Sequence, residues 1–208
     1  MKYFKIAILM IFAIMFWLQC QKSEDFSNIP TKSETEAIVK IGDTVAVQLI
    51  RTLKGELMKA IEEGGMVNAI SVCKTKALEL TSDIGRQVDP GIEIKRTTFN
   101  YRNPKNAPNE IELAALQFFE EKVRAGEGLP ANFVQKIPGD QKTTFYYYKP
   151  LKTAGLCLGC HGNPQAMDKN LVSKIQELYP DDKAIGYEEG DFRGVIRVKI
   201  PEELIGRG

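Results

Sequence analysis

The chain has 208 residues, of which 43% are hydrophobic and 26% are charged, and its formal net charge is +1. This length and composition are typical of one globular domain with a real core, and they argue against a disordered chain. The near-neutral charge argues against a nucleic-acid partner, which would favour a basic face. The chain contains four cysteines and one histidine, His161, so a histidine-dependent catalytic site would have to use that residue.

Residues 1–19 have the pattern of a secretion signal. Two lysines precede an uninterrupted apolar run at residues 6–18, which suits a signal peptide and is too short to span a bilayer comfortably. We interpret residues 1–19 as a lipoprotein-type signal peptide, with Cys20 as the lipidated first residue of the mature chain. Ordinary cleavage and an uncleaved short anchor are the alternatives, because residues 17–19 lack the usual small side chains. Each places the body of the protein outside the cytoplasm, and we expect membrane anchoring on the periplasmic side of a bacterial cell envelope.

Residues 20–33 are polar and are interpreted as a tether, so the domain is predicted to occupy residues 34–208. Ser33 and Glu36 have the spacing of a capping box, which predicts that a helix begins near Glu34. Apolar residues three and four apart predict one long helix from there to Gly64 and Gly65, and a second helix over residues 66–84.

The rest of the chain alternates between predicted strands and helices. Alternation predicts a strand at residues 92–99, and Asn109 with Glu112 predicts the capped start of a helix over residues 110–125. Two strands, at residues 131–137 and 142–151, flank a turn, and a helix over 168–179 precedes a final strand at 192–200. Few strands, separated by turns or helices, predict an α+β fold with a small antiparallel sheet and a long N-terminal helix.

Residues 157–161 have the sequence Cys-Leu-Gly-Cys-His, the motif for covalent haem attachment in c-type cytochromes. Two thiols separated by two residues can reach the two vinyl groups of one haem, and the adjacent histidine becomes the proximal iron ligand. The alternatives are half of a zinc knuckle, a thioredoxin-like pair and a structural disulfide. A zinc knuckle would need a second cysteine pair, and the thioredoxin context is missing. We therefore predict one covalent haem c held by Cys157, Cys160 and His161.

The motif leaves the second axial ligand open, because the chain has no second histidine. Met167 follows His161 too closely to reach the opposite face of the haem, whereas Met58 and Met66 are candidates. Cys73 is another candidate, since it lies on the apolar face of the second predicted helix and has no partner once the other cysteines are used. A water-ligated or open site is the third alternative.

Several short motifs stand in a characteristic order along the chain. They are residues 69–73 (AISVC), 96–98 (RTT), 102–109 (RNPKNAPN), 147–151 (YYKPL), 157–162 (CLGCHG) and 186–194 (GYEEGDFRG). Together they resemble the single-haem c-type family with a PAS-like fold and His/Cys axial ligation, which occurs as envelope proteins and as sensory domains of bacterial signalling proteins. The resemblance covers roughly residues 35–201. It implies a PAS-like sheet with helices packed around the haem, and it implies that Cys73 is the distal ligand.

These observations predict a membrane-anchored haem protein that senses redox state or a small gas, with an electron-transfer cytochrome c as the alternative. Reduction would release Cys73 and open a site for a small gas. We expect no enzyme activity, because no spare histidine could act as a distal acid or base. The chain has no room for a kinase, so the output should pass through an unknown redox or signalling partner. Arg96, Arg102 and Lys149 are candidate contacts for the haem propionates.

Overall fold

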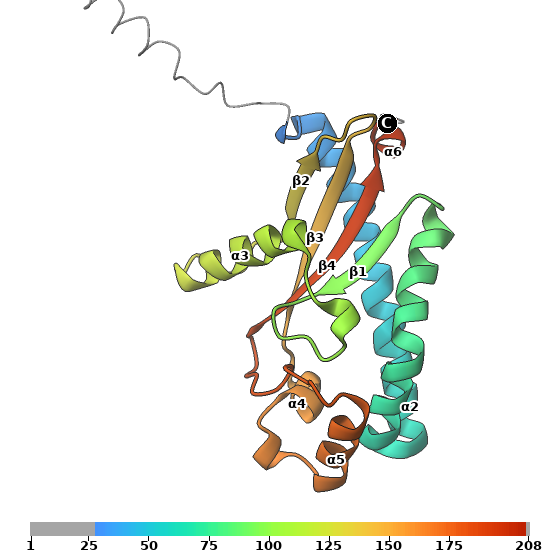
Figure 1. The fold of residues 1–208 in the computed structure, drawn as a ribbon, viewed down its shortest axis with the longest axis vertical. Helices are drawn as coiled ribbons and strands as arrows, with labels where there is room; N and C mark the ends of the chain where they lie inside the picture. Colours follow the sequence, from blue (N-terminus) through green and yellow to red (C-terminus); the bar gives the residue numbers. More distant parts are fainter. Residues whose placement is uncertain (1–27, 207–208) are drawn as a thin grey trace, which may run out of the picture.

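The computed structural model describes residues 28–206 and confirms an α+β fold with a long N-terminal helical element and a small antiparallel sheet (Figure 1). The signal peptide, Cys20 and most of the tether lie outside the described residues. Within residues 28–206, no helix combines the length and the apolar character needed to cross a membrane. The elements are α2 (Lys32–Val88), β1 (Glu93–Thr97), η2 (Pro104–Asn106), α3 (Glu110–Arg124), β2 (Phe133–Ile137), β3 (Thr144–Lys152), α4 (Gly155–His161), η3 (Pro164–Ala166), α5 (Lys169–Leu178), β4 (Phe192–Pro201) and α6 (Glu202–Ile205).

The first helix begins earlier than predicted. The Thr31 hydroxyl accepts a hydrogen bond from the Glu34 N–H at 3.2 Å, and the Glu34 carboxylate accepts one from the Thr31 N–H at 2.6 Å. The capping box is therefore formed by Thr31 and Glu34, and the prediction that Ser33 caps the helix is wrong. Ser33 lies inside the first turn, so the last residues of the predicted tether belong to α2.

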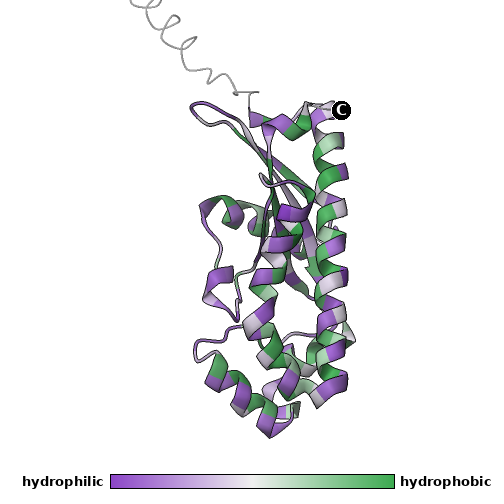
Figure 2. Cartoon of the chain, turned by 90° about the vertical axis from the view of Figure 1, so that its right-hand side faces the viewer, coloured by the Kyte–Doolittle hydropathy of each residue, from purple (hydrophilic) through white to green (hydrophobic). Residues whose placement is uncertain are grey.

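The long element α2 is a helical hairpin, as the two predicted helices indicated. Helical geometry is interrupted at Gly64 and Gly65, and Gly65 has φ of +71°, a conformation that favours glycine. The Asn68 side chain donates to the Ala60 carbonyl at 2.9 Å across this turn. Hydrophobic residues recur in bands along the helices (Figure 2), as expected for helices with one face on a core.

The four strands form an antiparallel sheet in the order β1-β4-β3-β2. Side chains alternate between its faces. Phe145 and Tyr147 of β3 pack beneath the first arm of α2, whereas Tyr146 and Tyr148 face α3 on the other side. The main core lies between α2 and the sheet and contains Ile38, Val45, Ala46, Leu49, Ile84, Ile92, Phe145, Tyr147, Ile196, Val198 and Ile200.

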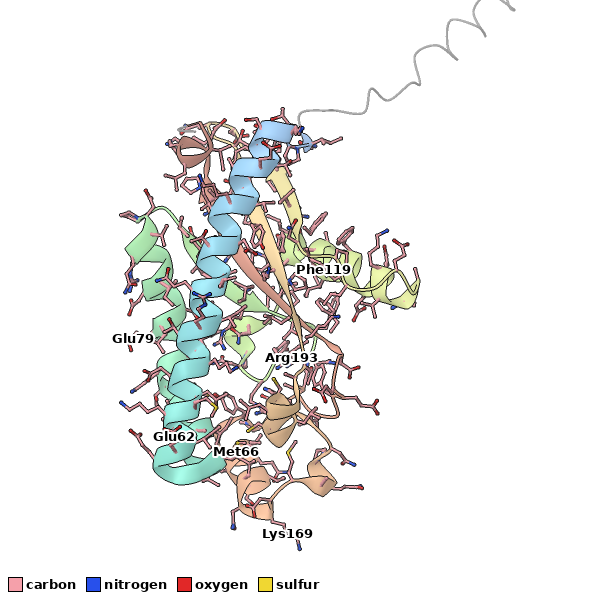
Figure 3. The ribbon with its side chains drawn as sticks, turned by 180° about the vertical axis from the view of Figure 1, so that it is seen from behind. Glu62, Met66, Glu79, Phe119, Lys169 and Arg193 are labelled. Atoms are coloured by element: carbon pink, nitrogen blue, oxygen red, sulfur yellow. The ribbon has the colours of Figure 1, made fainter. Side chains whose placement is uncertain are left out.

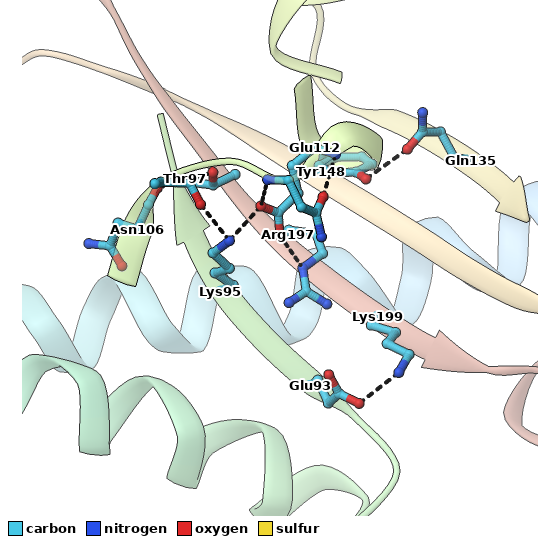
Figure 4. A network of polar contacts seen from close by, with 11 residues as sticks. Glu93, Lys95, Thr97, Asn106, Glu112, Gln135, Tyr148, Arg197 and Lys199 are labelled. Carbon is cyan, nitrogen blue, oxygen red and sulfur yellow. Dashed lines mark hydrogen bonds and ion pairs between the residues drawn. The ribbon is translucent and has the colours of Figure 1, made fainter. Parts of the chain in front are cut away.

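A buried carboxylate fastens α3 to the sheet. Glu112 is 1% exposed, and its oxygens lie 2.6 Å from Lys95 Nζ and 3.1 Å from Arg197 Nε (Figure 4). The same side chain accepts a hydrogen bond from the Asn109 N–H at 3.0 Å, while Asn109 caps the Glu112 N–H at 2.9 Å. The predicted cap of α3 is therefore confirmed, and its glutamate also binds β1 and β4.

The helices α4 and α5 meet the hairpin end of α2 at the opposite end of the molecule from α6 (Figure 1). Their own core is small and consists of Ile70, Leu171, Ile175 and Tyr179, with Met66, Cys160 and Leu178 packed against it. Lys74 of α2 reaches across and donates to the Leu178 carbonyl at 2.8 Å. The candidate site lies between this helical end and the sheet.

Candidate functional site

Cys157, Cys160 and His161 lie on α4, the short helix that follows β3. The sequence alone does not predict this helix, because the glycines in and beside the segment lower helix propensity. Contacts from a distant segment support the helix start, where the Gly155 N–H donates to Glu189 Oε1 at 3.2 Å. Residues three and four apart share one face of a helix, so α4 presents all three side chains on one side.

The three side chains border a cavity between α4, both arms of α2 and the end of β1. Its remaining walls are Leu57, Ile61, Met66, Ile70, Cys73, Ala77, Arg96, Thr98, Arg102, Asn103, Asn106, Leu156, Tyr179 and Arg193. The α2 side is mostly apolar, and the sheet side is polar and cationic. In Figure 3, Met66 and Arg193 mark these two sides near α4.

Cys73 lies on the second arm of α2 and faces the same cavity as the Cys-Leu-Gly-Cys-His segment. Among residues 28–206, Cys73, Cys157 and Cys160 are all free thiols. Burial raises the pKa of the Cys73 thiol, and the positive charges of Arg96 and Arg102 partly oppose that shift. Burial also raises the pKa of Cys160. The fold thus brings Cys73 to the motif across a long stretch of sequence.

The imidazole of His161 is held by one ring nitrogen. Its Nδ1 lies 2.7 Å from the Ala184 carbonyl oxygen, and because a carbonyl only accepts, Nδ1 must carry the proton. Desolvation, reinforced by Arg193 and Arg102, lowers the pKa of His161 to about 3. His161 is therefore neutral at neutral pH, and Nε2 keeps the free lone pair that a metal ligand needs.

Two guanidinium groups lie at the sheet side of the cavity. The alternation of β1 directs Arg96 to the face that α2 covers, and its buried Nε makes no hydrogen bond with any residue the structure describes. Arg193 donates to the Asn100 carbonyl at 3.2 Å and lies 4.9 Å from the Tyr187 ring centre. Burial lowers the pKa of both arginines. This arrangement suits an anionic group, which would satisfy buried donors and charge together.

The other two predicted propionate contacts differ from Arg96. Arg102 lines the cavity but already donates to the Cys160 carbonyl at 2.6 Å and pairs with Asp182 at 2.9 Å. Lys149 lies apart from the cavity walls, and its Nζ is 2.6 Å from Asp43. The structure therefore brings Arg96 and Arg102 to the site but not Lys149.

The three methionines considered as ligands lie in different places in the fold. Met66 lines the cavity, Met58 is 37% exposed on α2, and Met167 borders a separate groove on another side of α4. Tyr179 and Arg193 also line the cavity, and neither was expected there from the sequence. Tyr179 continues the four-residue apolar spacing of α5, which was a usable signal, whereas the place of Arg193 depends on strand pairing that the sequence did not reveal.

Comparison with known proteins gives one family and one solved structure. The family model described as Tll0287-like matches residues 21–201. The crystal structure of the cyanobacterial heme-protein Tll0287 is similar at 24% sequence identity, covering 78% of this chain and 95% of that chain with a TM-score of 0.49. No curated protein matches the chain.

Proposed function

The chain belongs to the Tll0287-like family, and from this premise we propose that it is a c-type haem protein. Cys157 and Cys160 would attach the haem covalently, and His161 and Cys73 would ligate its iron. The observation that carries the proposal is that α4 presents two free thiols and a neutral histidine to the cavity that Cys73 also lines. The protein after which the family is named is described as a heme protein, which supports the same cofactor.

The residues of the cavity fit this cofactor. Two thiols can add across two vinyl groups and form thioethers without an oxidant. The apolar side chains of α2 suit a porphyrin face, and Nε2 of His161 is free to bind iron. The buried, unpaired Nε of Arg96 beside Arg193 suits a propionate. Arg102 and Lys149 are engaged with Asp182 and Asp43, so we propose Arg96 as the main propionate contact.

When bound, the haem would supply a one-electron iron couple. Cys73 would then act as an anionic sulfur donor that favours the oxidised iron and lowers the reduction potential. Arg96 and Arg102 contribute by favouring the charged form of Cys73. The hydrogen bond from His161 to Ala184 increases the donor strength of the imidazole.

We propose that the protein senses redox state or a small gas, and that electron transfer is the alternative. The position of Cys73 supports sensing, because it lines the same cavity as His161 but belongs to a separate element, so its release would leave space there for a small gas. An electron carrier would instead need two ligands that stay bound to the iron.

The cellular setting is proposed from the N-terminal sequence. Residues 1–19 would direct export, and lipidated Cys20 would anchor the domain to a membrane on the periplasmic side of the cell envelope. A partner protein would receive the signal or the electron. We propose no catalysed reaction, since the sequence contains no second histidine to act as an acid or base at the haem.

The cofactor is tested with the full chain produced together with c-type maturation factors. A pyridine haemochrome assay should show one covalent haem per chain, and substitution of both Cys157 and Cys160 by alanine should abolish covalent attachment. His161→Ala should disturb ligation. Covalent haem in the double alanine variant would exclude the proposed attachment.

The distal ligand is tested with Cys73→Ala, which should keep covalent haem but change the ferric Soret band and the EPR spectrum. Met66→Leu is the matched control, because Met66 lines the same cavity on the same arm of α2. Unchanged spectra for Cys73→Ala, with changed spectra for Met66→Leu, would transfer the role to Met66. Carbon monoxide binding to the reduced protein would support sensing, whereas an unchanged six-coordinate spectrum would support electron transfer.

A further inference from the structure

We propose that Arg102 is a positioning residue for His161, and that with Asp182 it determines which ring nitrogen carries the proton. This inference rests on the proposed function for its purpose, because a ligand histidine must present one unprotonated nitrogen. The evidence for the geometry itself comes from the chain alone.

The Arg102 guanidinium connects two segments that surround His161. Its Nη2 donates to the carbonyl of Cys160 at 2.6 Å and to the carbonyl of Ala184 at 3.3 Å. The first carbonyl belongs to the residue before His161, and the second accepts the hydrogen bond from His161 Nδ1. One cation thus holds both the backbone that carries the imidazole and the acceptor that orients it.

Asp182 holds the arginine and the Ala184 peptide at the same time. Its Oδ2 accepts from Arg102 Nε at 3.1 Å, and its Oδ1 accepts from the Ala184 N–H at 2.9 Å. The side chains of Arg102 and Asp182 are each 9% exposed. The N–H and C=O of Ala184 are therefore both fixed by a nearly buried ion pair, so the carbonyl stays aimed at the imidazole.

Neighbouring backbone hydrogen bonds align the two segments, but they do not involve the Ala184 carbonyl, which Arg102 holds. The Tyr187 N–H donates to the His161 carbonyl at 3.0 Å, and the Gly186 N–H donates to the Gly162 carbonyl at 2.8 Å. Neither contacts the imidazole or its acceptor. The hydrogen bond at Nδ1 selects the tautomer of a neutral histidine, so the position of the Ala184 carbonyl determines that Nε2 stays unprotonated.

Arginine is suited to this task in a way that lysine is not. Its planar fork of fixed donors serves a carboxylate and two carbonyls together, whereas a lysine ammonium is a flexible point charge. Arg102→Lys therefore keeps the positive charge but loses the fixed geometry. A role limited to charge would survive this substitution, and a positioning role would not.

The test uses the full chain labelled with ¹⁵N-histidine and produced without haem. The chain has one histidine, so long-range ¹H–¹⁵N correlation reports His161 alone. At pH 7.5 the wild type should show the Nδ1–H tautomer. Arg102→Lys and Arg102→Met should increase the Nε2–H fraction about tenfold, as the loss of a charge-assisted hydrogen bond predicts.

Arg197→Lys is the matched control, because Arg197 also pairs with a buried carboxylate, Glu112, but away from the cavity. It should leave the tautomer unchanged. Asp182→Asn is a second, isosteric test if the Arg102 variants fail to fold, and it should also raise the Nε2–H fraction. A wild-type tautomer in folded Arg102 variants, or in folded Asp182→Asn, would overturn the proposal.

The same variants are then loaded with haem. Arg102→Lys should keep covalent haem by pyridine haemochrome but shift the reduction potential, and Arg197→Lys should not shift it. If the wild type takes up no haem, the proposed function fails, while the tautomer result still decides the role of Arg102. An unchanged potential with covalent haem present would count against Arg102 and not against the cofactor.

Discussion

The imidazole of His161 has different surroundings at its two ring nitrogens. Nδ1 donates a hydrogen bond to the Ala184 carbonyl at 2.7 Å, and the ring lies near the positive charges of Arg193 and Arg102. Desolvation, reinforced by these charges, lowers the pKa of His161 from 6.5 to about 3. The ring is therefore kept neutral, which is the form that binds a metal. At acidic pH this lowers the free energy of unfolding, because the unfolded chain gains a proton on its histidine and the folded chain does not.

This shift predicts a pH dependence for the haem-free chain. The unfolded chain protonates its histidine near pH 6.5, whereas the folded chain keeps it neutral to about pH 3. The contribution of His161 to stability is therefore fully present above pH 6.5 and is lost as the pH falls toward 3. Urea unfolding should show a decrease of up to about 2 kcal/mol in the free energy of unfolding between pH 7 and 5.

The control for this pH effect is His161→Gln, which removes the sequence's one histidine. Its free energy of unfolding should change much less over the same interval, because carboxylates titrate mainly at lower pH. An equal decrease in the wild type and in His161→Gln would contradict the assignment to His161.

At the scale of elements, the first arm of α2 approaches the sheet through a glycine. A methyl group added at Gly42 would lie 2.1 Å from Cγ of Tyr147, which is fully buried. The Tyr147 hydroxyl also donates to Asp43 at 2.8 Å. The ring therefore cannot move aside without breaking a hydrogen bond, and the position requires a residue without a side chain.

Gly42→Ala should lower the free energy of unfolding by about 1–3 kcal/mol, the usual effect of overpacking a core. Gly55→Ala is the matched control on the same arm, because a methyl group there meets nothing within 4 Å. It should raise stability by about 0.5–1 kcal/mol through helix propensity. Urea unfolding of both variants measures the difference, and equal effects would show that Tyr147 does not restrict the contact.

The elements differ in how well their sequences predicted them. The cap of α3 was predictable because Asn109 and Glu112 form a local pattern that the structure repeats. The start of α2 was placed too late, because Thr31 and Ser33 both have a glutamate three residues on and only Thr31 caps the helix. The helix α4 was missed because Glu189, from a distant segment, supports its first turn.

At the scale of the whole molecule, the cavity depends on contacts between distant segments. Spacing on the second helix was enough to propose that Cys73 faces a core, and the resemblance to a haem family placed it near His161. The ion pair between Arg102 and Asp182 joins residues 80 positions apart, and no local pattern could reveal it. Its charge makes Lys149 a candidate for the site, but the structure places its ammonium beside Asp43 of α2, away from the cavity walls.

The molecule has two parts with different amounts of core. The sheet and the first arm of α2 share a large buried cluster, whereas α4, α5 and the hairpin end of α2 share only a small one. The cavity lies between these parts. A cofactor attached to α4 and ligated by Cys73 of α2 would join elements that otherwise have little buried surface in common.

Hydrogen exchange measured by mass spectrometry should therefore differ between the haem-free and haem-loaded chains. In the haem-free chain, amides of residues 155–187 should exchange at least about tenfold faster than those of β3, because local opening costs less where few apolar groups are buried. Haem should slow exchange in this region, since a ligand that binds the folded state stabilises what it contacts.

β3 is the internal control, because it pairs with β2 and β4 on both sides. Equal protection of both regions without haem would contradict the division into two parts, and unchanged exchange with haem would show that the cofactor does not join them.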